Sequence, residues 1–418
     1  MKDILKELYW RGLLYKSTLG INEQFKKEDD TIYIGFDPTS DSLHIGNLLP
    51  IFMLEHFHLF DHKTLTIIGG ATGMIGDPAG KHKERTLLDK EILLHNMQCI
   101  QKQLDIVLNV DKKKTKLLNN YDWIGNLSFL NFVRDIGKTL TVNYMMAKDS
   151  VKCRLRAESE GISFTEFTYQ LLQAFDFYHL YTNENCRLQI GGSDQWGNII
   201  TGIEFIRRIT GNTAHGITFP IVSNSSGTKF GKSDNNENIW LDYRKTSPYK
   251  FYQFWLNLSD KESSLFIKFY TFFQKEEINH LLFNHNKYQY KRILQKTLAK
   301  NMTKCIHGEE NYKKYLKVSN LLFGKYSIRS LASLNEKTLL TNVHRGLLKG
   351  GLSIIEALTD SVFFYSKGET IRALKENSIY VNREKVNDKF VFNENSIIAN
   401  RYILLQKGKK NYFILEVV

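Results

Sequence analysis

Short apolar runs alternate with longer segments of helical periodicity through the first half of the chain. Four of these runs have the length of a buried strand and stand at 31–36, 64–70, 186–192 and 218–222. Between and after them the spacing predicts helices at 44–60, 85–108 and 164–181 and from about residue 194. Because strands that alternate with helices typically form a parallel sheet covered by helices, the sequence predicts an α/β domain over residues 1–247.

The pattern changes at Pro248. Aromatic and aliphatic residues at helical spacing continue without a clear strand, which predicts a helical domain over 248–330. Residues 331–349 lose this periodicity and end in a glycine-rich stretch, so we predict a linker there. Two helical patterns and several short β-type runs then predict a compact α+β domain over 350–418.

Composition narrows the function classes. The 418 residues include 57 Lys and Arg against 44 Asp and Glu, a net charge of +13 that suits a polyanionic partner such as a nucleic acid or nucleotide. The four cysteines stand far apart, which argues against a disulfide scaffold or a cysteine-rich zinc site. The chain has no apolar stretch of membrane-spanning length and no signal-peptide pattern, so we expect a cytoplasmic protein that does not enter a membrane.

The glycine clusters do not match the common nucleotide-binding or hydrolase motifs. A P-loop would need a glycine at Ile75, a dinucleotide fingerprint would need one at Ala71, and a G-x-S-x-G elbow would need one at Gln195. The histidines at 56, 58 and 62 lack an H-E-x-x-H pattern. We expect them to lie beside a core, and we predict no metal site.

The stretch from Tyr33 to Leu48 has the features of an anion site. A predicted strand ends there, a turn rich in Asp, Pro, Thr and Ser follows, and a helix begins near Gly46. Backbone N–H groups at a helix start attract anions, and a glycine lets a ligand approach the backbone. His44 and Asn47 stand three residues apart and can both face that ligand, although an N-cap beside a surface histidine would explain the same residues.

A second polar stretch, SNSSGTKFGKS at 223–233, carries two lysines three residues apart. A loop with Lys229 and Lys232 can fold over a polyphosphate, although many such loops are merely solvated. Together the two stretches resemble the paired motifs of the class I aminoacyl-tRNA synthetases, here HIGN at 44–47 and KFGKS at 229–233. Relative to that family, Asn47 replaces the second histidine of the first motif, and Phe230 and Gly231 replace Met and Ser of the second.

The resemblance is closer to the bacterial-type tyrosyl-tRNA synthetases and extends over most of residues 30–255. The segments that carry it are YIGFDPTSDSLHIGN, GGATGMIGDPAG, NNYDWIG, VNYMMAKDSV, GISFTEFTYQLLQAFDF and QIGGSDQWGNI. The tail is similar to the S4-type RNA-binding module that ends those enzymes. So many matches in the same order make coincidence implausible.

The resemblance implies a Rossmann-like catalytic domain, a helical anticodon-side domain and an S4-like RNA-binding domain. It also implies ligation of L-tyrosine to tRNA(Tyr) through a tyrosyl-adenylate, with ATP and Mg²⁺ as a substrate complex, no tightly bound cofactor, and a homodimeric protein. Two alternatives are a tryptophan–tRNA ligase of the same fold and a non-catalytic RNA-binding protein built on it.

A polar stripe on the predicted helix 164–181 fits a tyrosine pocket. Tyr169, Gln173 and Asp176 follow one another at i, i+4 and i+7 among apolar neighbours, a pattern typical of a wet pocket lining rather than a solvated face. We expect Asp176 and Tyr33 to bind the phenolic hydroxyl, and Tyr169 and Gln173 to bind the α-ammonium. On the opposite, core-facing side we expect Phe164, Phe167, Leu171, Ala174, Phe175 and Tyr178.

The resemblance assigns the remaining site residues. Thr39, His44 and Asn47 would hold the phosphates from one side, while Lys229 and Lys232 would close from the other. Gln195 would meet the tyrosyl carbonyl region, and Asp77 would help to bind the ammonium unless it only caps the turn before Pro78. The ATP-binding residues implied are Gly35, Asp37, His44, Gly46, Gly192, Asp194, Lys232 and Ser233.

Overall fold

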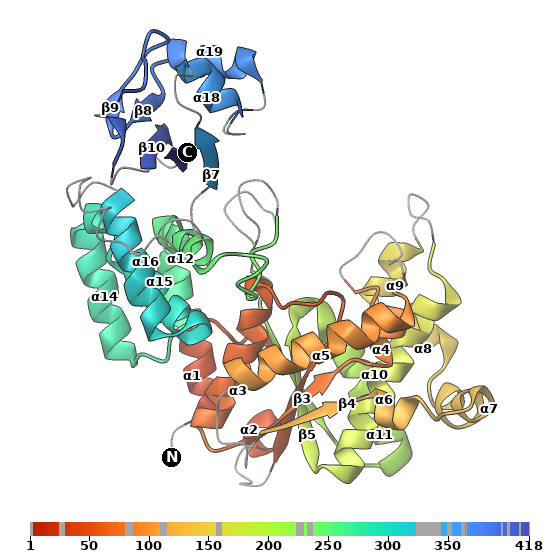
Figure 1. Cartoon of the computed structure of the whole chain (residues 1–418). Coiled ribbons are helices and arrows are strands. Elements are labelled where there is room, and N and C mark those ends of the chain that lie inside the picture. The colour runs from red at the N-terminus through yellow and green to blue at the C-terminus, as the bar shows by residue number, and fades with distance from the viewer. Residues whose placement is uncertain are drawn as a thin grey trace. The chain divides into compact units, whose positions relative to one another are not determined.

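The computed structural model places two compact units in the chain (Figure 1). Met1–Asp242 and Leu258–Leu298 form the first unit, and Tyr243–Asn257 and Ala299–Val418 form the second. The predicted helical domain 248–330 is therefore divided between the two units. The structure describes residues 3–24, 30–79, 87–108, 115–155, 161–222, 230–231, 237–322, 344–348, 353–360, 364, 366–393, 396–398, 402–408 and 411–417.

A six-stranded sheet is the centre of the first unit. Its order is β1-β6-β5-β2-β3-β4, in which β6, β5, β2, β3 and β4 run parallel and β1 is antiparallel to β6. This confirms the predicted α/β class. The strands are β1 Lys16–Ser17, β2 Thr31–Phe36, β3 Lys63–Ile68, β4 Thr115–Asn119, β5 Cys186–Gly192 and β6 His215–Phe219.

Two strand predictions need correction. The last strand was expected at 218–222 but lies at His215–Phe219. It ends before Pro220, which has no N–H to donate to a neighbouring strand. The polar strand β4 was not predicted, because its TKLLN sequence offers no apolar run and it pairs only with β3, at one edge of the sheet.

The sheet opens between β2 and β5. These strands pair only as far as Tyr33 with Gln189. Each then continues for three residues against its outer neighbour, β2 against β3 and β5 against β6. The strand order also reverses here, since the chain runs from β2 outward to β4 before it returns as β5. Such a switch point leaves a crevice at the carboxyl ends of the strands, where α/β proteins bind ligands.

Helix α10 (Phe164–Asn183) is packed on both sides. Phe177 and Leu180 join a core under Tyr33 of β2, and Leu171 and Ala174 join a second core with Phe205. Of the predicted core face, Phe164 is the exception, with 68% of its surface exposed at the first turn. The other helical elements before β6 are α1 Ile4–Arg11, α2 Ile21–Gln24, η1 Ile45–Asn47, α3 Leu48–Leu59, α4 Thr72–Ile75, α5 Lys90–Val107, α6 Tyr121–Ile124, α7 Phe129–Asn131, η2 Phe132–Ile136, η3 Gly137–Thr139, α8 Val142–Met146, α9 Asp149–Arg154, η4 Ser193–Gln195 and α11 Trp196–Thr210.

The described segment 248–322 consists of helices joined by short connections and contains no strand, as its periodicity predicts. Pro248 occupies the first turn of its first helix, where its missing N–H has no intrahelical partner to lose. The helices are α12 Pro248–Leu256, α13 Asp260–Phe269, α14 Lys275–Lys287, η5 Gln289–Lys291, α15 Ile293–His307 and α16 Glu309–Leu322.

The tail folds as a small α+β body with the sheet order β7-β11-β10-β8-β9. Helices α18 and α19 pack on it around Ile354, Leu358 and Leu374. The predicted linker 331–349 includes one of its strands, β7, which pairs with β11 in parallel. The two strands are distant from each other in the sequence, so the local periodicity around β7 does not reveal their pairing. The elements are β7 His344–Leu348, α18 Ile354–Asp360, α19 Lys367–Lys375, β8 Ile379–Val381, β9 Glu384–Lys385, β10 Tyr402–Lys407 and β11 Asn411–Val417.

Candidate active site

A cavity of about 210 Å³ lies where β2 and β5 separate. Ile34 and Ile190 contribute its apolar surface at the point where strand pairing ends, and α10 supplies much of the polar lining. Nine of the residues predicted from sequence line it: Tyr33, Gly35, Asp37, Asp77, Tyr169, Gln173, Asp176, Gly192 and Gln195.

Asp176 is a buried carboxyl group held by two donors. Asn120 Nδ2 donates to one of its oxygens and Trp123 Nε1 donates to the other, each at 2.8 Å. Burial raises the pKa of Asp176 to about 7, although both hydrogen bonds favour the ionised form. The carboxylate is therefore fixed in one orientation and titrates near neutral pH.

The hydroxyl of Tyr33 lies in the same cavity. It is buried and has no hydrogen-bond partner among the residues that the structure describes. Its ring packs against the ring of Phe177 in α10, with 5.3 Å between the ring centroids. A buried hydroxyl without a partner is costly, so it marks a position where a ligand's polar group would bind.

A second polar cluster lines the cavity around two further carboxyl groups. Tyr169 donates to Asp37 Oδ2 at 2.9 Å, and Thr72 donates to Asp37 Oδ1 at 2.7 Å. Asp37, predicted as an ATP-binding residue, thus shares a hydrogen bond with a predicted tyrosine-binding residue. Three carboxyl groups in one cavity (Asp37, Asp77 and Asp176) favour a cationic group of the ligand.

Asp77 belongs to a chain of amide contacts. Gln195 Nε2 donates to Asp77 Oδ2 at 2.5 Å, and Gln173 Nε2 donates to Gln195 Oε1 at 3.3 Å. The backbone N–H of Ala79 also donates to Asp77 at 2.9 Å, so this residue caps the turn as well as lining the cavity. The capping interpretation of Asp77 is therefore correct, and its role in binding the ammonium stays a prediction.

Sequence reasoning missed the residues that hold the carboxyl groups. Asn120 and Trp123 orient Asp176, Thr72 contacts Asp37, and Asn198 donates to Asp77 at 3.4 Å. Asn120 and Trp123 stand in NNYDWIG, a segment noted for its family resemblance but without a role. They follow the unpredicted strand β4, so nothing in the local pattern brought them to the pocket.

The first motif lies outside this cavity, at the start of α3. His44 precedes η1, and Asn47 Oδ1 accepts the His44 backbone N–H at 3.0 Å. The N-cap interpretation of the motif is thus correct in part, because Asn47 caps the turn. Thr39 and Gly46 lie on the same connection between β2 and α3. Its backbone is tied to residues 239–241 by hydrogen bonds from Ile45 N to Ile239 O and from Leu241 N to Leu43 O.

The described part of the second motif touches the first. Gly231 has a φ of +104°, and a Cβ placed on it would lie 3.1 Å from the Gly46 nitrogen. Phe230 is buried against Phe266, 4.3 Å between ring centroids. The two replacements relative to the family pattern therefore have structural reasons: glycine suits the positive φ, and phenylalanine fills an aromatic site. Lys229, Lys232 and Ser233 lie outside the described residues.

Asp194 lines a different cavity of about 460 Å³, although its Oδ1 lies only 2.6 Å from where a Cβ on Gly192 would stand. This cavity also contains Lys16, Lys148 and Trp196. Burial lowers the pKa of Lys148 to about 8.

Two findings concern the described residues only. They contain no group of three or more His, Cys, Asp or Glu side chains arranged to hold a metal ion. None of the described helices has the length and apolar composition required to cross a bilayer.

Comparisons with known proteins agree over the whole chain. Residues 26–324 match the sequence model of the class I tRNA synthetases (W and Y), and residues 341–415 match the tyrosine–tRNA ligase SYY-like C-terminal domain. The tyrosine–tRNA ligase of Flavobacterium johnsoniae is 49% identical and that of Bacteroides thetaiotaomicron is 48% identical. The alignments cover 100% of both chains in the first case and 99% of both in the second.

Among solved structures, a truncated mitochondrial tyrosyl-tRNA synthetase from Aspergillus nidulans is 28% identical, with a TM-score of 0.69, over 77% of this chain and 95% of its own. A tryptophanyl-tRNA synthetase from Plasmodium falciparum, 14% identical with a TM-score of 0.54 over 80% and 87%, shares the fold. The full-length identity and both family matches lead to one conclusion: the chain belongs to the tyrosine–tRNA ligases of the class I tRNA synthetases.

Proposed function

We propose that the chain activates L-tyrosine with ATP to give tyrosyl-adenylate and pyrophosphate, and then transfers tyrosine to the 3′ end of tRNA(Tyr). The observation that carries this proposal is that the buried Asp176, with its carboxyl group, and the buried Tyr33, with a hydroxyl unpartnered among the described residues, line the same cavity. A phenolic hydroxyl both donates and accepts, so it can donate to the carboxylate and accept from Tyr33 at the same time.

The other end of the cavity suits the α-ammonium of the amino acid. Tyr169 and Gln173 would bind it beside the carboxyl groups of Asp37 and Asp77, and Gln195 would contact the tyrosyl carbonyl region. The substrate would then lie with its ring between the separated strands.

Adenylate formation needs no nucleophile from the enzyme. An oxygen of the tyrosine carboxylate attacks the α-phosphorus, a P–O bond forms, and the bond to the departing pyrophosphate breaks. We propose that Mg²⁺ enters with ATP. The enzyme then contributes positioning and stabilisation of the developing negative charge.

We assign the phosphate contacts to Thr39, His44 and Asn47 on one side and to Lys229 and Lys232 on the other. The contact between Gly231 and Gly46 supports this assignment, because it joins the two motifs. Gly35, Gly46 and Gly192 would allow close approach of ATP to the backbone, Ser233 would add a hydroxyl, and Asp37 and Asp194 would act at the nucleotide side of the site.

Tryptophan fits the cavity less well. An indole N–H donates but cannot accept, so it would leave the Tyr33 hydroxyl without a partner. The high identity to named tyrosine–tRNA ligases favours tyrosine as well. An RNA-binding protein without catalysis has no need of the carboxyl-lined cavity.

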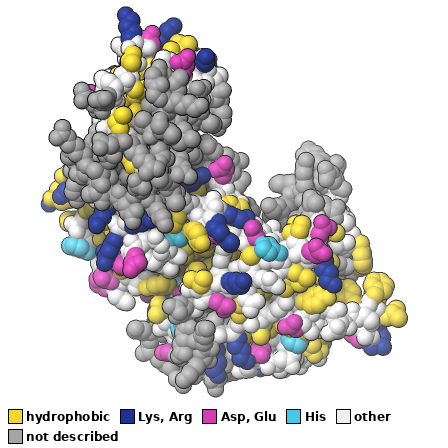
Figure 2. All heavy atoms as spheres, in the orientation of Figure 1, with side chains coloured by type: hydrophobic (Ala, Val, Ile, Leu, Met, Phe, Trp, Pro, Cys, Tyr) yellow, Lys and Arg dark blue, Asp and Glu magenta, His cyan; other side chains and the backbone are white. Residues whose placement is uncertain are grey.

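We also propose that the protein is a cytoplasmic homodimer. Exposed apolar side chains gather on the elements between α7 and the start of α10, where Figure 2 shows hydrophobic atoms at the surface. Such a patch on one face is typical of a protein interface, and a second copy would bury it. Its members are Phe129, Leu130, Val133, Val142, Met146 and Phe164.

The direct test is exchange of labelled pyrophosphate into ATP. We expect exchange that depends on tyrosine and is not supported by tryptophan, with slower exchange but little change in tyrosine affinity for Lys232→Ala. Exchange with tryptophan would favour the first alternative, and no exchange with any amino acid would favour the second.

A further inference from the structure

Arg11, near the N-terminus, has a buried guanidinium group that donates four hydrogen bonds. Only 2% of its surface is exposed. It donates to the backbone carbonyls of Lys268, Thr271 and Phe273 at 2.7 to 2.8 Å, and its Nε donates to the Glu7 carboxylate at 2.7 Å. No residue of α1 lines the substrate cavity, so this arrangement is not explained by substrate binding.

The three carbonyls stand at and just beyond the end of α13, which ends at Phe269. The last carbonyls of a helix lack intrahelical partners and carry its negative end, so a cation that donates to them stabilises the end. A planar guanidinium can reach several carbonyls at once, and a lysine ammonium cannot reproduce that geometry. Arg11 therefore fixes the path of residues 268–273.

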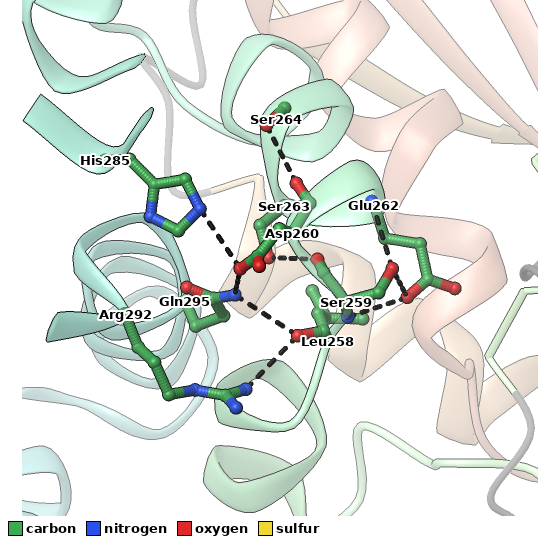
Figure 3. Close-up of polar contacts among 9 residues, drawn as sticks. All are labelled: Leu258, Ser259, Asp260, Glu262, Ser263, Ser264, His285, Arg292 and Gln295. Carbon is green, nitrogen blue, oxygen red and sulfur yellow. Dashed lines mark hydrogen bonds and ion pairs between the residues drawn. The ribbon is translucent and has the colours of Figure 1, made fainter. Parts of the chain in front are cut away.

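The other end of α13 is fixed as well (Figure 3). Ser259 and Glu262 form a capping box, and Gln295 Nε2 donates to Asp260 Oδ1 at 2.6 Å. The buried His285 lies 3.1 Å from the same carboxylate oxygen, and Arg292 donates to the Leu258 carbonyl at 3.2 Å. The helix is thus held at both ends by polar side chains from other elements.

The segment held in this way supports both ATP-side motifs. Phe272 stacks on Phe52 of α3, 5.0 Å between centroids, directly after the first motif. Phe230 of the second motif packs against Phe266 and Tyr270, with centroids 4.3 and 6.1 Å away.

The charge of Arg11 also affects His56, a residue of α3. Burial lowers the pKa of His56 to about 3, and the nearby Arg11 cation contributes to this effect. His56 is therefore neutral and packs against Phe272, 5.0 Å between ring centroids.

We infer that Arg11 is a positioning residue for the activation of tyrosine by ATP. It acts through α13 and the aromatic side chains of this segment, which hold the first and second motifs in their relative positions. The inference rests on the proposed function. It assigns a catalytic consequence to a residue that does not line the substrate cavity, whose lining among the described residues comes from positions 33 to 219.

The test separates the ATP step from tyrosine binding. For Arg11→Lys we expect kcat of tyrosine-dependent pyrophosphate exchange to fall on the order of tenfold, because small displacements of catalytic groups are costly, while the tyrosine Kd stays within about twofold. The matched control is Arg207→Lys, where the arginine is exposed and also binds a glutamate on its own helix. We expect no change for it.

Three further substitutions keep the test independent of folding. Phe272 is 40% exposed, so Phe272→Leu should fold and should show the same split between kcat and tyrosine Kd. In a double-mutant cycle, Arg11→Lys should couple with Phe230→Leu and be additive with Gln173→Asn.

Equal losses in kcat and tyrosine affinity, or no loss in either variant, would overturn the inference while leaving the proposed function intact. Absence of tyrosine-dependent exchange in the unmodified protein would overturn the proposed function itself.

Discussion

The tyrosine cavity and the ATP-side motifs are built by different means. In the cavity, side chains hold one another: the buried Asp176 accepts hydrogen bonds from the buried Asn120 and the partly buried Trp123. At the motifs on the ATP side, main-chain contacts hold the segments together. Gly231 lies against Gly46, and residues 43–45 bond to residues 239–241 through main-chain groups.

This difference matches the tasks that we propose for the two regions, which are tyrosine binding in the cavity and ATP binding at the motifs. Discrimination between amino acids requires polar groups that are costly to leave without a partner. A polar group has this cost only when it is buried. Stabilisation of negative charge on a triphosphate requires several hydrogen-bond donors around the reacting phosphorus. Because these donors come from separate segments of the chain, the segments must be held in fixed relative positions. We therefore expect mutations in the cavity to change affinity for the amino acid and mutations at the motifs to change rate.

The largest effect should come from Asp176→Ala. The phenol would lose its acceptor, and the Asn120 and Trp123 donors would lose their partner. We expect kcat/KM for tyrosine to fall by about 10³-fold or more, since sites built to bind a hydroxyl discriminate by factors of this order, while the KM for ATP changes little. Steady-state pyrophosphate exchange measures both constants.

Asp135→Ala is the matched control for that substitution, because Asp135 is exposed and pairs only locally with Arg134. It should behave like the unmodified protein. Unchanged tyrosine kinetics in Asp176→Ala would contradict the placement of the phenol.

His44→Ala tests the other region. We expect kcat for adenylate formation to fall by about 10²-fold, the usual cost of removing one donor from a developing oxyanion, with tyrosine Kd unchanged. The exposed His280 offers the matched control His280→Ala, for which no change is expected. Pre-steady-state adenylate formation and equilibrium tyrosine binding provide the two readouts, and parallel losses in both would remove the distinction between the regions.

The two regions also differ in how well the sequence predicts them. The stripe of Tyr169, Gln173 and Asp176 follows from helical spacing alone, and all three residues line the cavity. Their supports do not follow, because Asn120 and Trp123 reach Asp176 from a segment more than fifty residues earlier. Helical spacing determines which residues share a face, whereas contacts between distant segments depend on the complete fold.

The same limit explains the errors in the fold. The parallel sheet follows from alternating strands and helices, yet β4 and β7 were missed because their pairing partners, rather than their own sequences, make them strands. The exposed Phe164 was assigned to the core because periodicity cannot distinguish a core face from a surface available to another chain.

Gly231→Ala should have a smaller effect than His44→Ala. The new Cβ would lie 3.1 Å from the Gly46 nitrogen at a backbone φ of +104°. We expect a loss of about 1–3 kcal/mol in local stability and about a tenfold fall in kcat, with tyrosine affinity retained.

Gly211→Ala is the control that distinguishes backbone strain from the loss of the contact between the two motifs. Gly211 has a φ of +74°, but nothing lies within 4 Å of its added Cβ. It should cost about 1 kcal/mol of stability without a change in kcat. Equal effects of the two substitutions on kcat would show that the approach of the motifs does not matter.

The smallest effect concerns pH. Asp176 has a pKa of about 7, so its ionised form, which we propose accepts from the phenol, declines as the pH falls through that value. Protonation also removes an acceptor from one of the two donors that hold the group. We expect tyrosine affinity to decrease by at most about tenfold from pH 8 to pH 6, because the ionised fraction of the group falls by that factor. The comparison with Asp176→Asn is decisive, because this substitution removes only the Asp176 carboxyl group from the cavity. That variant should bind tyrosine weakly and with no pH dependence in this range, as measured by equilibrium dialysis. A profile of the same slope in both proteins would assign the titration to another group and would remove Asp176 from the phenol.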